Sequence, residues 1–381
     1  MKITAGKIYL SKSRKRPTAI VQLLTDEGIS GVGEVGMHFG SRATASYLAE
    51  FVRRYMLGQD PRHPEKHWDR IYRESGWSRG GGPVLLGAIS ALDEAMWDIV
   101  GKCLGVPVYM LLGGKVRDRI RLYANGWYRT GGPPSDYAAD AEKVVRQGFK
   151  ALKFDPFQDV SEELGWRPRR IWQREEIEVA ARRIAAVRDA IGPEVEIFLE
   201  GHGWFDVGTA VEIAHRVAEY GIRFFEEPID STNPEALAQV AAAIPMAVAT
   251  GEKIYTRWGF LPFLQHGAMR IAQPDVGNTG GISEMRKIAA LADSFLISIA
   301  PHNCWGPIGT AATVQVDAST VNLQVQELFP YEGDDHYRMV DHAWELDVKD
   351  GYMPVADGRP GLGVELNEAY MASNLIETVE P

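Results

Sequence analysis

From about residue 119 onward, short apolar runs alternate with longer stretches in which apolar residues recur at helical spacing. The apolar runs predict β-strands at residues 120–124, 151–154, 195–199, 223–225, 246–249, 270–272, 296–300 and 322–325. Most of the gaps carry amphipathic patterns that predict helices, for example at residues 174–190 and 207–220. Repeated strand–helix units predict a parallel α/β sheet. Eight such units predict a closed barrel, and a doubly wound open sheet is the alternative.

The first part of the chain has a different pattern. Two β-rich runs, at residues 18–24 and 29–35, flank the turn Asp26-Glu27-Gly28, and helical periodicity follows to about residue 112. This pattern predicts a small α+β domain. After about residue 340 the chain is rich in turns, and we expect this tail to pack back on the N-terminal domain. The expected divisions are therefore residues 1–118, 119–340 and 341–381.

The composition of the chain excludes some kinds of binding partner. The 381 residues carry a formal net charge of −10, which argues against binding to nucleic acids or anionic membranes. The two cysteines, Cys103 and Cys304, are too few for a disulfide framework, and this fits a reducing cytoplasm. The chain starts without a signal-peptide pattern, and its longest apolar runs are too short to cross a bilayer. We expect a cytoplasmic protein with a small-molecule partner.

Glutamates follow three successive predicted strands at equal intervals, at Glu200, Glu226 and Glu252. The carboxyl ends of barrel strands meet at one rim, so these side chains are expected to converge there. Alone, each glutamate would be interpreted as a solvated or salt-bridged residue. Three carboxylates without a cysteine suit a hard cation such as Mg²⁺ better than Zn²⁺. The neighbouring Glu227 is expected to point elsewhere and to have a structural role.

Other polar residues follow the remaining strands, and we expect them at the same rim: Lys153, Asp155, His202, Asp275, His302 and Glu327. A lone histidine is more often a packed structural residue than a catalytic one. Asp275, one strand before His302, favours instead an oriented imidazole base. The glycines that flank His202 leave the direction of its side chain open.

These motifs occur in an order that resembles one known family. They are Leu199-Glu200-Gly201-His202, Phe225-Glu226-Glu227-Pro228, Thr250-Gly251-Glu252-Lys253, Gln273-Pro274-Asp275 with Gly280-Gly281, and Ala300-Pro301-His302-Asn303. Together they resemble the enolase superfamily, specifically the mandelate racemase subgroup and its sugar acid dehydratases of the galactonate and gluconate type. The resemblance covers essentially the whole chain. It implies a modified TIM barrel, (β/α)7β, with an N-terminal α+β capping domain that the C-terminal segment completes.

The resemblance also implies roles for the rim residues. The three glutamates would bind one Mg²⁺ per subunit, and the ion would chelate the carboxylate of the substrate. His302, oriented by Asp275, would take the proton beside that carboxylate, and His202 would protonate a departing hydroxyl. Glu327 would donate a hydrogen bond to the developing enediolate, which requires a protonated carboxyl. The resemblance further suggests a homo-oligomer.

Candidates for substrate binding are Lys153, Asp155 and Glu327 at the barrel rim, and His38 and Trp77 in the capping domain. For His38 and Trp77, a surface or packing role is the competing interpretation. The pair Lys153-x-Asp155 departs from the Lys-x-Lys pair of many members. No lysine base therefore stands opposite His302, which favours dehydration over two-base racemisation. A glutamate at position 200, where aspartate is commoner, leaves the detailed coordination open.

Three functions remain in consideration. The first is dehydration of an aldonate, such as galactonate, gluconate or arabinonate, to a 2-keto-3-deoxy acid. The second is cycloisomerisation or epimerisation of a sugar acid, or of its lactone or anhydro form, through the same enediolate. The third is a catalytically silent metal-binding protein on the same fold. Gly31-x-Gly33-x-x-Gly36 also fits a dinucleotide fingerprint, but no clear helix follows it, so nucleotide binding is not expected.

Overall fold

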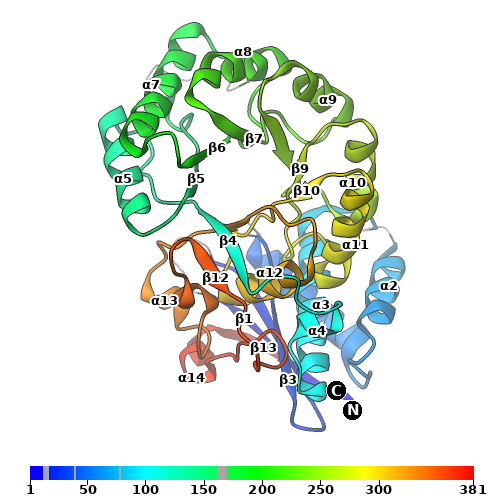
Figure 1. Cartoon of the computed structure of the whole chain (residues 1–381). Helices are drawn as coiled ribbons and strands as arrows, with labels where there is room; N and C mark the ends of the chain where they lie inside the picture. Colours follow the sequence, from blue (N-terminus) through cyan, green and yellow to red (C-terminus); the bar gives the residue numbers. More distant parts are fainter. Residues whose placement is uncertain (12–16, 38–39, 77–78, 161–169) are drawn as a thin grey trace.

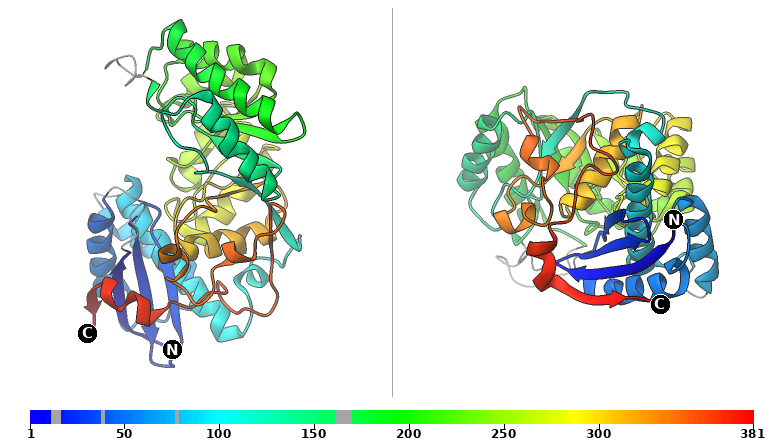
Figure 2. Two further views of the ribbon diagram at one scale, coloured as in Figure 1. Left: turned by 90° about the vertical axis from the view of Figure 1, so that its left-hand side faces the viewer. Right: turned by 90° about the horizontal axis from the view of Figure 1, so that it is seen from below.

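The computed structural model describes residues 1–11, 17–37, 40–76, 79–160 and 170–381. His38 and Trp77 lie outside the described residues, so their predicted contacts with substrate stay predictions. A small N-terminal domain and a barrel lie side by side, as Figures 1 and 2 show. No described helix is long and apolar enough to cross a membrane.

The N-terminal domain contains an antiparallel sheet in the order β13-β1-β2-β3. Its strands are β1 (Ile3–Leu10), β2 (Ala19–Thr25), β3 (Ser30–Glu34) and β13 (Leu375–Val379). Its helices are α1 (Ser41–Phe51), η1 (Val52–Met56), α2 (Pro64–Glu74) and α3 (Gly82–Leu104). The C-terminal strand lies beside β1 and completes this sheet (Figure 2), as predicted. The exact domain boundaries stay a prediction.

The first two glycines of the dinucleotide-like motif, Gly31 and Gly33, bring β3 into contact with α3. A Cβ atom at Gly33 would lie 1.9 Å from the Ala91 carbonyl oxygen, and one at Gly31 would lie 2.1 Å from that of Ala95. No side chain fits in this space, so only glycine allows the strand and the helix to approach so closely. Gly31 and Gly33 therefore serve packing within the N-terminal domain, whereas Gly36 lies against Gly277 and Trp305 of the barrel.

The second domain contains parallel strands in the order β10-β9-β8-β7-β6-β5-β4-β11. They are β4 (Arg119–Ala124), β5 (Ala151–Phe154), β6 (Glu196–Glu200), β7 (Ile222–Glu226), β8 (Ala247–Thr250), β9 (Ile271–Ala272), β10 (Ser298–Ile299) and β11 (Gln326–Leu328). A parallel bridge between Ile299 and Leu323 joins β10 to the segment before β11, which closes the barrel. The prediction for the last strand was wrong in position: residues 322–325 contribute this bridge, and the strand itself starts at Gln326.

Helices surround the barrel: α5 (Pro134–Arg146), α7 (Arg174–Ile191), α8 (Val207–Val217), α9 (Pro234–Ala243), α10 (Thr256–Gln265), α11 (Gly281–Ser294) and α12 (Pro307–Ser319). Shorter elements are α4 (Val108–Leu111), η3 (Ala218–Tyr220), α13 (Asp334–Tyr337), η4 (Trp344–Asp347), α14 (Glu368–Met371) and η5 (Ala372–Asn374). The strand β12 (Tyr352–Pro354) pairs antiparallel with β4 and was not predicted.

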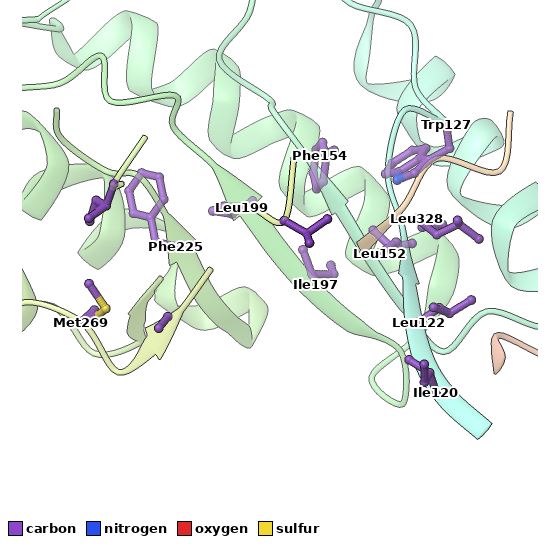
Figure 3. Packing of buried hydrophobic residues seen from close by; sticks show 14 of the residues in the cluster. Ile120, Leu122, Trp127, Leu152, Phe154, Ile197, Leu199, Phe225, Met269 and Leu328 are labelled. Carbon is purple, nitrogen blue, oxygen red and sulfur yellow. The ribbon is translucent and has the colours of Figure 1, made fainter. Parts of the chain in front are cut away.

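Alternation along the strands determines which side chains enter the barrel. Leu152, Ile197, Leu199 and Phe225 pack in the large core beneath the helices (Figure 3). The residues that alternate with them, such as Phe198, belong to a separate cluster. Each barrel strand, or the residue next to its end, contributes one side chain to this cluster. Such a cluster forms only inside a closed barrel. Because side chains alternate, Lys153, Glu200 and Glu226 lie on this inner side, at the carboxyl ends of their strands.

The capping domain is joined to the barrel through the first turns of α11 and α12. The residues that precede these helices, Gly280 and Gly306, have no side chain with which to cap them. Glu34 accepts hydrogen bonds from the backbone nitrogens of Gly306 (2.8 Å) and Gly309 (3.0 Å). Asp93 accepts one from the backbone nitrogen of Ser283 (2.9 Å). Carboxylates of one domain thus cap two helices of the other.

These two carboxylates are buried at the domain junction. Burial raises the pKa of Glu34, and it raises the pKa of Asp93 to about 7. A Cβ atom at Gly306 would lie 2.3 Å from the nearer Glu34 oxygen, so glycine is required where the carboxylate approaches. The capping domain is therefore fixed to the side of the barrel rim that carries α11 and α12.

Candidate active site

The predicted metal ligands converge at the rim. Glu200 and Glu226 are the last residues of β6 and β7 and are paired in register, and Glu252 follows β8 by two residues. Each offers a carboxylate oxygen within 4.8 Å of the other two. Glu200 and Glu226 are buried, and carboxylates gathered this closely favour a compensating cation.

Lys153 supplies one positive charge in this cluster. Its Nζ atom lies 2.6 Å from Glu226, 2.9 Å from Glu327 and 3.1 Å from Glu200. Burial disfavours the charged amine, but the surrounding carboxylates, Glu226 first, hold the pKa of Lys153 well above its usual value. These contacts favour the charged ammonium form of the residue. It also lines the cavity described below, as a substrate contact must.

His302 forms the expected pair with Asp275. Its Nδ1 atom lies 2.5 Å from an Asp275 oxygen, and its Nε2 atom lies 3.2 Å from Glu252. The same aspartate accepts hydrogen bonds from the Gly277 backbone (2.8 Å) and from the Trp305 indole (2.5 Å). The imidazole is thus fixed through Nδ1, and Nε2 points towards the glutamate cluster.

His202 forms a second pair of this kind, with Asp155. The distance from its Nδ1 atom to an Asp155 oxygen is 2.7 Å. Burial works against a charged ring here, but Glu200 and Asp155 raise the pKa of His202 to about 10. Asp155 itself is only 1% exposed and is not among the residues that line the cavity, and the direct substrate contact predicted for it stays a prediction.

Glu327 lies among several hydrogen-bond donors. It accepts hydrogen bonds from the Asn125 amide (2.8 Å) and from the Asn303 backbone (3.0 Å), besides its ion pair with Lys153. Burial opposes ionisation, yet Lys153 and His302 lower the pKa of Glu327 below its ordinary value. The contacts fit a role in orienting Lys153 and Asn125, and the hydrogen bond that Glu327 was predicted to donate to the enediolate stays a prediction.

Glu227 points away from the cluster, as expected. It is buried, accepts a hydrogen bond from the Thr250 hydroxyl (3.1 Å) and is paired with Lys253. Lys253 also lies 3.1 Å from the metal-ligand candidate Glu252. Glu227 therefore helps to hold the loop after β8 in place.

A cavity of about 440 Å³ opens above these residues. Its walls include both histidines, Glu200, Glu252, Lys153 and Glu327, and the capping domain contributes Gly36, Met37 and Pro83. Sequence reasoning missed further residues of the wall, among them Asn125, Tyr255, Asn278 and Phe329. Asn125 directly follows β4, so attention to the end of the first barrel strand could have identified it.

The closed parallel barrel, its capping domain and the carboxylate cluster between two histidines define an enzyme of the enolase type. Residues 6–113 match the family described as "Mandelate racemase / muconate lactonizing enzyme, N-terminal domain", and residues 136–370 match "Enolase C-terminal domain-like". The chain belongs to this family of the enolase superfamily, and the predicted superfamily, fold class and lyase class are confirmed.

Relatives of known name cover nearly the whole chain. A D-galactonate dehydratase of Ralstonia nicotianae is 35% identical over 97% of this chain and 94% of the relative. A D-gluconate dehydratase of Thermoproteus tenax is 33% identical over 95% of this chain and 70% of the relative. The crystal structure of an enolase superfamily member from Salmonella Typhimurium superposes with a TM-score of 0.93, with 34% identity and full coverage of both chains.

Proposed function

We propose that this chain is a Mg²⁺-dependent dehydratase that converts an aldonate, such as galactonate, gluconate or arabinonate, into its 2-keto-3-deoxy acid. The observation that carries the proposal is the pair of histidines on opposite walls of one cavity. His202 follows β6 and His302 follows β10, and these strands are four positions apart in the barrel order. A substrate between them presents its two faces to two different imidazoles.

The glutamates fit a magnesium site. Three carboxylate oxygens within 4.8 Å of one another are hard ligands of the kind that Mg²⁺ prefers. Glu200, Glu226 and Glu252 would hold one ion per subunit. When bound, Mg²⁺ would stabilise the negative charge that develops on the substrate carboxylate.

The chemistry of the side chains follows from their positions. His302 takes the C2 proton through Nε2, because its Nδ1 atom is engaged by Asp275. His202 gives a proton to the C3 hydroxyl as the C3–O bond breaks, and the C2–H electron pair forms the C2=C3 double bond. Water leaves, and the enol tautomerises to the 2-keto acid. Lys153 lines the cavity among three carboxylates, and we expect its charge to attract the substrate carboxylate.

A panel of aldonates and aldarates tests the proposal. The purified protein is incubated with each acid and Mg²⁺, and 2-keto-3-deoxy acids are measured by semicarbazone absorbance. We expect product from at least one aldonate, and none after removal of metal with a chelator. No product from any acid with Mg²⁺ present would remove the proposal.

The two opposed histidines also suit a second candidate, epimerisation or cycloisomerisation. A proton taken by one histidine could be returned from the opposite face by the other. Incubation in D₂O separates the two functions, because the second introduces deuterium at C2 of a product that has lost no water.

A further inference from the structure

Two aspartates at the rim are held in the same way. Asp275 follows β9, accepts a hydrogen bond from the backbone nitrogen two residues later (Gly277, 2.8 Å) and binds the Nδ1 atom of a histidine with its other oxygen. Asp155 follows β5, accepts one from Phe157 (2.8 Å), also two residues later, and binds Nδ1 of His202 (2.7 Å). In each case the turn fixes one carboxylate oxygen and leaves the other for an imidazole on the next strand.

The anchor of Asp155 is itself rigid. Phe157, whose backbone nitrogen binds the first oxygen, is buried and packs edge-on against Phe205, with ring centroids 5.0 Å apart. Asp155 is 1% exposed. The carboxylate therefore cannot turn towards the cavity without leaving both of its partners.

His202 is held at all its polar atoms except one. Its backbone is left-handed (φ 50°) between Gly201 and Gly203, a conformation that costs energy for a residue with a side chain. Its backbone nitrogen donates to Glu200 (2.7 Å), and its carbonyl oxygen accepts from Lys253 (3.3 Å). The Nε2 atom has no hydrogen bond to any residue that the structure describes, and the side chain is 36% exposed and lines the cavity.

We propose that Asp155 is a positioning residue for the dehydration step: it keeps a proton on Nδ1 of His202, so that Nε2 is the nitrogen that delivers a proton to the leaving hydroxyl. This inference rests on the proposed dehydratase function. In the step, the Nε2–H bond breaks, the proton joins the C3 oxygen, and the C3–O bond breaks to release water. His202 is left neutral, with its Nδ1–H bond still directed at Asp155.

The variant Asp155→Asn tests this role, because the backbone of Phe157 decides how an asparagine would orient. The Phe157 N–H needs an acceptor, so the amide oxygen stays on it and the amide NH₂ faces His202. Nδ1 then becomes an acceptor and Nε2 carries the hydrogen, so the ring is held in the opposite tautomer and Nδ1 loses the carboxylate that fixed it. The matched control is Asp275→Asn, which should move the ring hydrogen of His302 from Nδ1 to Nε2 in the same way.

The two variants are compared in D₂O with an aldonate that the wild type dehydrates. For Asp155→Asn we expect dehydration to fall about 100-fold while deuterium exchange at C2 stays within about threefold of the wild type. For Asp275→Asn both rates should fall together. Equal loss of both rates in Asp155→Asn, or an unchanged ratio of the two, would overturn the inference while the dehydratase function stands. Failure of the wild type to dehydrate any acid would instead remove the proposed function.

A second measurement covers the case in which Asp155→Asn does not fold. In ¹⁵N NMR spectra of wild-type protein labelled at histidine, Nδ1 of His202 should carry a proton in every state of the ring. A resonance typical of an unprotonated Nδ1 at His202 would overturn the inference without any assay of activity.

Discussion

The two walls of the cavity hold their histidines with the same device but in different surroundings. The wall of His302 adjoins the capping domain: the backbone nitrogen of Gly36 donates to the Gly277 carbonyl (2.8 Å), and Glu34 caps the helix that starts after His302. On the other wall, the described hydrogen bonds of His202 are all made with barrel residues. These are Asp155, Glu200 and Lys253. The side chain of His302 is 12% exposed and that of His202 is 36% exposed.

Under the proposed function, this difference favours a division of labour between the two histidines. Abstraction of a weakly acidic proton benefits from a base that is shielded from water, and the capping domain provides that shielding. The acid has only to reach a hydroxyl, so it can remain partly exposed. Changes at the domain junction should therefore act mainly on proton abstraction, and changes within the barrel at β5 and β6 mainly on the loss of the hydroxyl.

The largest effect is expected from His302→Asn. Without the base, both deuterium exchange at C2 and dehydration should fall, by about 10³-fold. Both rates are measured by NMR in D₂O. The control is His215→Asn, an exposed histidine whose Nε2 contacts only the Ala243 carbonyl, which should stay within about twofold of wild type. Survival of exchange in His302→Asn would mean that another residue takes the proton.

Removal of one glutamate should abolish the response of stability to Mg²⁺. For chelator-treated wild type, Mg²⁺ at 100 times its dissociation constant should raise the free energy of unfolding by about 2.7 kcal/mol. In Glu226→Gln this gain should vanish, because one buried carboxylate of the cluster is lost. Thermal unfolding with and without Mg²⁺ measures it. An equal gain in both proteins would place the ion elsewhere.

Glu34→Gln weakens the junction beneath the wall of His302. The amide can accept from only one of the two backbone nitrogens, Gly306 and Gly309, and loses the favourable charge at the start of the helix. We expect a loss of about 1–3 kcal/mol in the free energy of unfolding. Exchange at C2 should fall in parallel with dehydration.

The control for Glu34→Gln is Glu235→Gln, an exposed glutamate in the first turn of α9, with an expected change below about 0.5 kcal/mol. If Glu34→Gln reduced dehydration alone, the division between the two walls would be contradicted.

The smallest effect concerns the pH dependence of stability. Burial raises the pKa of Asp93 to about 7 from its model-peptide value of 3.8, so the folded protein holds this proton more tightly than the unfolded chain. The protonated Asp93 carboxyl therefore contributes its full stabilisation below about pH 4. This contribution to the free energy of unfolding is lost as the pH rises towards 7.

In wild type, Asp93 should make the free energy of unfolding fall by at most on the order of 1 kcal/mol per pH unit between pH 5 and 7, and Asp93→Asn should remove this fall. Urea unfolding of both proteins across this range measures the difference. Parallel slopes would show that Asp93 is already ionised in the folded protein at the lower pH.

Much of the fold could be predicted, because alternating apolar runs specify both the strands and their inward faces. Glu200 and Glu226 each lie two residues after an inward-facing phenylalanine, Phe198 or Phe224, so alternation places their side chains on the same inner side. The last strand was placed a few residues early, since the apolar run at 322–325 contributes a bridge to β10 and the ladder with β4 starts at the polar Gln326.

The contacts across the site could not be predicted in the same way. That Asp155 binds His202, and that Lys153 reaches three carboxylates, depends on distances between neighbouring strands, which one sequence does not encode locally. The position of Glu327 among donors on three separate segments is likewise not encoded locally. Capping of α12 by Glu34 joins residues 272 positions apart and has no local sequence signature.

The most direct test of the central claim is His202→Asn in D₂O with Mg²⁺ and an aldonate that the wild type dehydrates. If one imidazole takes the C2 proton and the other releases the hydroxyl, the recovered aldonate should gain deuterium at C2 at close to the wild-type exchange rate, while almost no 2-keto-3-deoxy acid forms. Unlabelled aldonate recovered from this variant, or dehydration at the wild-type rate, would contradict the assignment of the two steps to the two histidines.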